Sequence, residues 1–278
     1  MTDGEAPPEG GAARDGAATA ARENATNTTS DGAATAALVG ATGGAGTTRC
    51  AVEMATTLAR DGRSVAVLDA AFATQGLSDY VPGRLETDLT ALVTDDTSAP
   101  LAAGLVDLDL DVPGRVACCP VRAPFERLAR AKTAGAARRL ESRIEEAADA
   151  FDHVLVDTPP VAANQSVAAA TACERTALVA PATDRGADAI GRMRDRLDDL
   201  GVGVDVAVAN RGELAACDVS LPASDAVAVD AAPVCEAGTG TFAAAVAAAT
   251  ERTMGWSADG LSEDRGLFDR IGGYVSNR

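Results

Sequence analysis

Short runs of apolar and β-branched residues recur along the chain, and longer segments with helical spacing separate them. Apolar runs without polar alternation are typical of strands buried on both faces of a parallel sheet. Their alternation with helices predicts an α/β fold, a mostly parallel sheet with helices on both faces. The predicted strands are 36–39, 64–69, 115–119, 153–157, 176–180 and 204–209.

Helices are predicted at 48–60, at roughly 124–150 and at 184–200. The first has apolar residues at helical spacing from Val52 to Ala59. The second is interpreted as a solvated face with i,i+4 ion pairs, and DNA binding through its arginines is the alternative. Its charged residues include Arg127, Arg130, Arg138, Arg139, Arg143, Glu141, Glu145 and Glu146.

The chain is divided into three parts by composition. Residues 1–34 have almost no large apolar side chain, so they cannot bury enough surface to offset their ordering entropy. We predict that they form a disordered tail, with a mobile tether as the functional alternative. The predicted folded domain is 35–255, and 256–278 form a C-terminal tail.

The charge balance disfavours some partners. The net charge is −17, and an acidic surface repels nucleic acid and anionic lipid. Lys132 is the only lysine, and aromatic residues make up 3% of the chain. This composition is typical of proteins from a high-salt cytoplasm, where charge repulsion is screened. It also requires a core built from Ala, Val, Leu and Ile.

The cysteines and the single histidine do not suggest a metal centre. Six cysteines form no CxxC pair, and His153 lies near no cysteine-rich cluster. The thiols are interpreted as small buried residues in a reducing compartment. We expect no signal peptide and no membrane span, and therefore a cytoplasmic protein.

A glycine-rich stretch joins the first predicted strand to the first predicted helix. It reads Gly40-Ala41-Thr42-Gly43-Gly44-Ala45-Gly46-Thr47-Thr48. Strand, glycine loop and helix together form a phosphate cradle, because successive backbone N–H groups and the helix N-terminus face the anion. The stretch therefore predicts a nucleotide-phosphate site.

This loop resembles the deviant Walker A motif of the MinD/ParA family, which includes CobQ- and CobB-like P-loop NTPases of the SIMIBI type. Its glycines match Gly43, Gly44 and Gly46, and Thr48 matches the residue that holds Mg²⁺. The resemblance implies a site for ATP or ADP with Mg²⁺. The implied nucleotide residues are Gly43, Gly44, Ala45, Gly46, Thr47, Thr48 and Asn210, and the implied Mg²⁺ residues are Thr48, Asp69 and Asp157.

Further motifs of the family follow in order over roughly residues 36–250. Asp69, with 75–78 after it, resembles the switch motif, and Asp157 before Thr-Pro-Pro resembles Walker B. Asn210 matches the residue that contacts the adenine edge, although a simple turn residue is the alternative. Segments 221–225 and 232–234 resemble two late motifs.

Three positions depart from the family pattern. The Walker lysine is replaced by Thr47, the signature lysine by Thr42, and the second switch aspartate by Ala71. Lysine depletion does not explain all three, because arginine would replace lysine and Asp is abundant in this chain. Phosphoryl transfer depends on positioning and on neutralising phosphate charge, so we expect weak nucleotide binding and little or no hydrolysis.

Two functions from different classes fit these residues. The first is a positioning, scaffolding or regulatory factor, similar to the TadZ/CpaE type, acting as a homodimer with an unidentified protein partner. The second is an active ATPase in which Arg49 or a partner's arginine replaces the lysine. Arg49 is expected to point away from the cradle. A tyrosine-kinase-like relative is disfavoured, since the tail has one tyrosine, Tyr274.

The C-terminal tail carries an apolar stripe. As a helix, residues 263–278 would place Leu267, Phe268, Ile271, Tyr274 and Val275 on one face. The segment resembles the amphipathic membrane anchor of MinD proteins, which implies peripheral membrane contact. Docking on the protein's own core, or no structure at all, is the alternative, because Gly272 and Gly273 disfavour a helix.

Overall fold

The computed structural model describes residues 34–257. The predictions for the N-terminal tail and for the amphipathic segment 263–278 fall outside this range. Ala34 opens the first strand, and Trp256 is buried, with its indole N–H donating to Asp61 Oδ2 at 3.2 Å.

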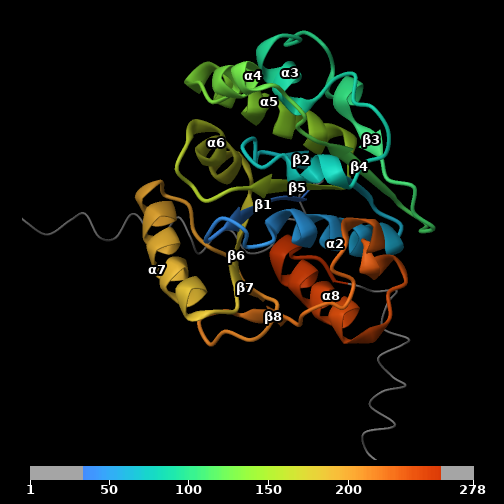
Figure 1. The fold of residues 1–278 in the computed structure, drawn as a ribbon, viewed down its shortest axis with the longest axis vertical. Helices are drawn as coiled ribbons and strands as arrows, with labels where there is room; N and C mark the ends of the chain where they lie inside the picture. The colour runs from blue at the N-terminus through green and yellow to red at the C-terminus, as the bar shows by residue number, and fades with distance from the viewer. Residues whose placement is uncertain (1–33, 258–278) are drawn as a thin grey trace, which may run out of the picture. The chain divides into compact units, whose positions relative to one another are not determined.

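Within residues 34–257, eight strands form one sheet in the order β3-β4-β2-β5-β1-β6-β7-β8 (Figure 1). Neighbours pair in parallel except β3, which runs antiparallel to β4. The mostly parallel sheet is confirmed, and the edge strands β3 and β8 were not predicted. The bounds are β1 Ala34–Gly40, β2 Ser64–Asp69, β3 Val106–Asp107, β4 Arg115–Cys119, β5 His153–Thr158, β6 Arg175–Pro181, β7 Val206–Asn210 and β8 Val219–Leu221.

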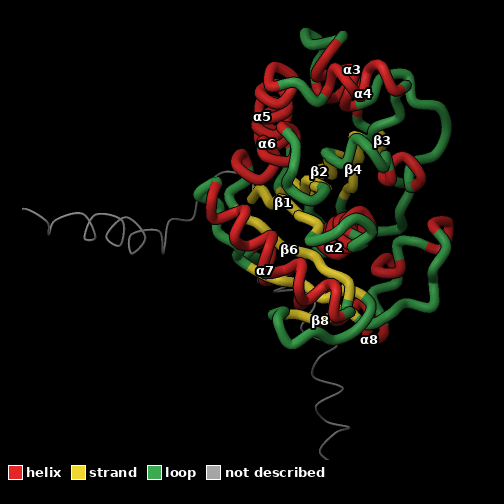
Figure 2. Tube along the Cα trace, turned by 60° about the vertical axis from the view of Figure 1, so that its left-hand side comes forward, coloured by secondary structure: helices red, strands yellow, loops and turns green. Residues whose placement is uncertain are grey.

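Helices cover both faces of the sheet, as the pattern predicts (Figures 1 and 2). One face packs against α2 and α8, and the other packs against α3 to α7. The helices are α2 Thr47–Arg60, α3 Leu89–Thr94, α4 Phe125–Ala131, α5 Ala134–Ala150, α6 Asn164–Ala172, α7 Asp184–Asp199 and α8 Gly240–Met254. Short 3₁₀ turns occupy Gly76–Asp79, Leu101–Gly104, Val229–Ala231 and Val234–Glu236.

Successive strand residues enter different halves of the core, which explains why the strands are continuously apolar. Val67 and Leu155 face α2 and α8, whereas Leu68 and Val156 face the opposite layer. Alanine, valine and leucine supply most of the buried side chains, in agreement with the low aromatic content. The central strands are therefore rigid supports for whatever their carboxyl ends carry.

The prediction of one long helix over 124–150 is wrong. The segment is divided into α4 and α5 at Lys132 and Thr133, and the Thr133 hydroxyl accepts from Ala136 N at 3.3 Å. Threonine is a favoured N-cap residue because its side chain competes for backbone N–H groups. The helical spacing continues across the break, so periodicity alone does not reveal it.

The prediction of a solvated face holds for part of this region: Arg130, Arg138 and Arg139 are exposed, Arg127 is half-buried and Arg143 is buried. Arg143 is only 8% exposed and donates to the carbonyls of Leu92 and Thr97 at 3.3 and 3.0 Å. Arg139 donates to Val93 O at 3.0 Å. These bonds satisfy carbonyls at the C-terminal end of α3, where a helix leaves them unpaired. Arg143 and Arg139 therefore hold α3 in place.

None of the helices in the described range is long and apolar enough to cross a membrane. All six cysteines lie in this range as free thiols, four of them buried. Burial raises the pKa of Cys50 and of Cys173 to about 12, so these thiols stay protonated near neutral pH.

The single histidine provides a direct test of the buried sheet. Burial lowers the pKa of His153 below its usual 6.5, and the charge of Arg63 acts in the same direction. Because the folded chain then disfavours the charged ring, His153 should cost stability as the pH falls below about 6.5, where the unfolded chain gains the proton. An NMR titration of this one imidazole should give a pKa below 6.5, and a value at or above 6.5 would contradict the described burial.

Candidate nucleotide site at the carboxyl edge of the sheet

The sheet brings the candidate residues together at one edge. Gly40, Asp69 and Asn210 are the last residues of β1, β2 and β7, and Asp157 is the penultimate residue of β5. Asp69 and Asp157 are register partners on adjacent strands. Carboxyl ends of parallel strands are the usual place for ligands in such folds, so the arrangement matches the expected position of a site.

The glycine loop turns back over the end of β1. Ala41 N donates to Val179 O at 2.8 Å, and Ala45 N donates to Thr42 O at 3.3 Å. Gly43 and Gly44 are exposed, and a Cβ added to either would meet no atom within 4 Å. This part of the loop is therefore open to a ligand.

Gly46 closes the loop and must be glycine for two reasons. Its φ is +88°, a left-handed conformation that other residues rarely adopt. A Cβ there would also lie 2.3 Å from Asn210 Nδ2, which donates to Ala45 O at 2.9 Å. Asn210 is thus tied to the loop that precedes α2.

Two buried carboxylates lie beside the start of α2. Thr48 Oγ1 donates to Asp157 Oδ2 at 2.5 Å, and Ala71 N donates to Asp69 Oδ1 at 2.9 Å. The remaining oxygens, Asp69 Oδ2 and Asp157 Oδ1, are buried without a hydrogen-bond partner among the described residues. Both carboxylates are 0% exposed, so each orphaned oxygen needs a partner such as a proton, a cation or an ordered water molecule.

The electrostatics of this pair follow from its burial. Burial raises the pKa of Asp69 well above its usual 3.8, and the charge of Asp157 raises it further, against the hydrogen bond from Ala71 N. Burial also raises the pKa of Asp157, while the hydrogen bond from the Thr48 hydroxyl opposes the rise. A bound cation would relieve both carboxylates at once.

The donor set fits a magnesium ion carried by a nucleotide. Carboxylate and hydroxyl oxygens are hard ligands, and Mg²⁺ is usually held by one or two carboxylates together with phosphates and water. Among residues 34–257, three or more His, Cys, Asp or Glu residues nowhere form a cage for a metal alone. Asp69, Asp157 and Thr48 therefore suit a metal that arrives with phosphate better than a dedicated metal site.

The positions that depart from the ATPase pattern lie at this loop. Thr47 opens α2, and Thr42 lies in the loop itself. Ala71 is buried, and only its backbone N–H donates to Asp69. None of these three side chains carries a charge, so they contribute nothing to neutralising phosphate.

Arg49 is directed away from the loop, as expected. Its Nε donates to Glu53 Oε1 at 2.6 Å, and its Nη1 donates to Ala226 O at 3.2 Å. Glu53 is 0% exposed and also accepts from Val234 N and Cys235 N at 3.0 and 2.8 Å. Arg49 and Glu53 therefore fasten α2 to the segment that covers its side.

The sequence pattern did not identify Glu53 and Arg211 as residues near the candidate site. Glu53 could have been noticed as a carboxylate in the strongly apolar turn between Val52 and Met54. Arg211 directly follows the strand-ending Asn210, and its Nη2 lies 3.7 Å from the position that a Gly46 Cβ would occupy. A cation at the carboxyl end of a strand is the signal that could have identified it.

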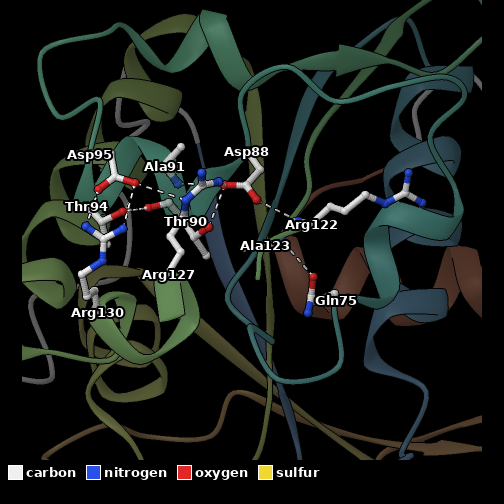
Figure 3. Close-up of polar contacts among 10 residues, drawn as sticks. All are labelled: Gln75, Asp88, Thr90, Ala91, Thr94, Asp95, Arg122, Ala123, Arg127 and Arg130. Carbon is white, nitrogen blue, oxygen red and sulfur yellow. Dashed lines mark hydrogen bonds and ion pairs between the residues drawn. The ribbon is translucent and has the colours of Figure 1, made fainter. Parts of the chain in front are cut away.

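A polar cluster around Asp88 and Gln75 supports the chain after β4 (Figure 3). Asp88 caps α3 by accepting from Ala91 N at 2.8 Å, and it accepts from Arg122 N at 3.0 Å. Gln75 Oε1 accepts from Ala123 N at 2.9 Å. Gln75, from the switch-like segment, thus fixes the chain after β4 instead of facing the glycine loop.

Arg127 and Arg130 complete the cluster around α3. Arg130 makes two hydrogen bonds to Asp95 at 2.7 and 3.1 Å, and Arg127 Nε lies 3.2 Å from Asp95 Oδ2. Figure 3 shows both guanidinium groups turned toward Asp95, with Arg122 pointing the other way. The cluster is a structural support for the site's edge.

Solved structures share this fold. MinD from Pyrococcus horikoshii, solved with Mg-ADP, has a TM-score of 0.67 at 18% identity, over 83% of this chain and 97% of that chain. A chain of the MinC:MinD complex from Aquifex aeolicus gives 0.66 at 17% identity, over 81% and 97%. Cobyrinic acid a,c-diamide synthase from Mycobacterium smegmatis, with an ATP analogue and magnesium, gives 0.61 at 15%, over 79% and 93%.

No family model and no curated protein matches the sequence. At such low identity the likeness establishes the architecture and leaves the chemistry to this chain's own residues. That architecture confirms the predicted fold class: the chain has the MinD-like P-loop α/β fold, with its glycine loop at the carboxyl edge of a mostly parallel sheet.

Proposed function

We propose that this chain binds ATP or ADP with Mg²⁺ weakly at the glycine loop and acts as a positioning or scaffolding factor with little or no ATPase activity. The observation that carries the proposal is the pair of orphaned carboxylate oxygens beside Thr48, at a loop whose lysine positions are threonines. The open glycines provide backbone N–H groups for phosphate. Asn210 is placed by the same loop and is proposed to contact the base.

The proposed site can bind nucleotide without hydrolysing it, because the two processes need different groups. Backbone N–H groups and a metal bind phosphate in the ground state, whereas hydrolysis needs positive charge on the phosphate oxygens and an oriented water. The three uncharged replacements remove those contributions. Removing one charge-stabilising group costs about 10²–10³ in rate, so removing several should lower hydrolysis by several orders of magnitude.

Phosphate release from ATP is therefore expected to stay at background at every Mg²⁺ concentration. The double variant Thr47→Lys with Thr42→Lys should bind nucleotide more tightly by about tenfold or more and still turn over slowly, because Ala71 remains. The rate is measured with purified full-length chain at high salt. A rate comparable to ordinary MinD-like ATPases would refute the scaffold proposal and favour an active enzyme that borrows an arginine from a partner.

The proposed partners are a second copy of this chain and a further protein. The exposed, uncharged glycines of the loop suit close approach of another backbone. Phe125, 85% exposed at the start of α4, offers an apolar contact on the same chain. Light scattering on the samples of the turnover assay reports a nucleotide-dependent dimer, and a monomer under all conditions would remove the second copy from the proposal.

A further inference from the structure

We propose that the Arg211 guanidinium binds the base-proximal phosphate of the nucleotide and supplies the positive charge that Thr47 and Thr42 lack. This inference rests on the proposed function and names the residue on which nucleotide affinity depends. Arg211 lies directly after Asn210 and close to Gly46, the residue that precedes α2. It is the first residue after the strand end that meets the glycine loop.

The backbone fixes the place of this side chain. Asn210 O accepts from Ala182 N at 2.9 Å, and Gly212 N donates to Leu221 O at 2.9 Å. Between these two bonds Arg211 has a φ of +67°, in the left-handed region that non-glycine residues seldom adopt. Such conformations concentrate at functional sites, because neighbouring structure must hold them in place. The guanidinium is therefore presented to the loop by a rigid turn.

The charge of Arg211 is free to act on a ligand. Among the described residues it takes part in no ion pair, whereas Arg49 is committed to Glu53. Its positive charge acts on the first turn of α2. There it lowers the pKa of Cys50, although burial, Asp157 and Glu53 together raise that pKa by more. In a chain of net charge −17, an unpaired arginine beside a glycine loop attracts phosphate rather than repelling it.

The position of Arg211 also determines which part of the nucleotide its guanidinium contacts. Asn210 Nδ2 and Arg211 Nη2 both lie close to the position that a Gly46 Cβ would occupy, whereas Asp157, the register partner of Asp69, accepts from Thr48. The carboxylates with orphaned oxygens mark the metal side of the polyphosphate. Arg211 therefore lies on the base side, where a planar guanidinium makes paired hydrogen bonds to phosphate oxygens.

The test is ADP binding to full-length chain, measured by calorimetry with and without Mg²⁺. Arg211→Gln should weaken ADP binding about ten- to a hundredfold, because one charge-assisted contact is lost. Arg211→Lys keeps the charge but loses the paired donors, so its affinity for ADP should lie between those of the unaltered chain and of Arg211→Gln. Arg192→Gln, at an exposed position of α7, makes the same change in net charge and should bind as the unaltered chain does.

Each result decides the inference. Equal affinity of the unaltered chain and Arg211→Gln would overturn it, with the proposed function intact. Arg211→Lys as weak as Arg211→Gln would also overturn it, because the positive charge at this position would then contribute nothing to binding. Absence of ADP binding by the unaltered chain would overturn the proposed function and this inference together. Melting temperatures of the three variants are measured alongside, and a common drop for Arg211→Gln and Arg211→Lys would assign the residue to the fold.

Discussion

Replacing Glu53 with alanine is expected to destabilise the chain by about 3–5 kcal/mol. The change removes the carboxylate that pairs with the Arg49 guanidinium. Removing one partner of a buried ion pair is strongly destabilising, because the other charge stays without compensation. It also leaves the N–H groups of Val234 and Cys235 without an acceptor. Glu53→Gln keeps one acceptor and should cost less, about 1–3 kcal/mol.

Urea or thermal unfolding at constant salt measures this effect. For a domain of this size, each kcal/mol lowers the melting temperature by roughly 2–4 °C, so Glu53→Ala should lower it by about 6–20 °C. Glu145→Ala, at an exposed position of α5, is the matched control and should stay within about 0.5 kcal/mol. A loss below about 1 kcal/mol for Glu53→Ala would show that Arg49 and the 234–235 backbone find other partners.

Asp157→Asn is expected to act in opposite directions on stability and on binding. The raised pKa values of Asp69 and Asp157 mean that the folded chain favours their protonated forms. Their contribution to stability is therefore present below about pH 3.8 and is lost as the pH rises through the raised values. Without nucleotide, the asparagine variant should be more stable at neutral pH by about 1–3 kcal/mol, the usual cost of an unpaired buried polar group.

The same substitution should remove the effect of Mg²⁺ on nucleotide affinity. Asparagine keeps an acceptor for Thr48 but lacks the charge that a divalent cation requires. Unfolding with and without Mg-ADP at several pH values checks both effects. Asp188→Asn, at an exposed position of α7, controls for the change in net charge. Equal stabilisation by Mg-ADP in the unaltered chain and in Asp157→Asn would exclude Asp157 from the metal site.

The central architecture could be predicted from sequence because buried parallel strands require continuous apolar runs. Residues 64–69 and 115–119 coincide with β2 and β4, and the carboxylate at the end of β2 was placed at the site edge. Short edge strands could not be predicted. β3 and β8 are two and three residues long, and their pairing depends on neighbours distant in sequence.

The site was predictable in its backbone and less so in its side chains. Glycine spacing and strand-end polar residues identified the loop, Asp69, Asp157 and Asn210, because topology alone gathers strand ends. The partners of the arginines depend on tertiary packing. Arg143 and Arg49 are each held by groups far along the chain, at Leu92 and Ala226, and no local pattern reveals those contacts.

The central proposal is that a carboxylate pair and an open glycine loop bind Mg-nucleotide. Calorimetry of ADP into the unaltered chain, with and without Mg²⁺, tests it most directly. We predict weak binding, in the micromolar range or above, which Mg²⁺ strengthens in the unaltered chain and leaves unchanged in Asp157→Asn. Absence of binding at any Mg²⁺ concentration, or affinity that Mg²⁺ does not change, would contradict it.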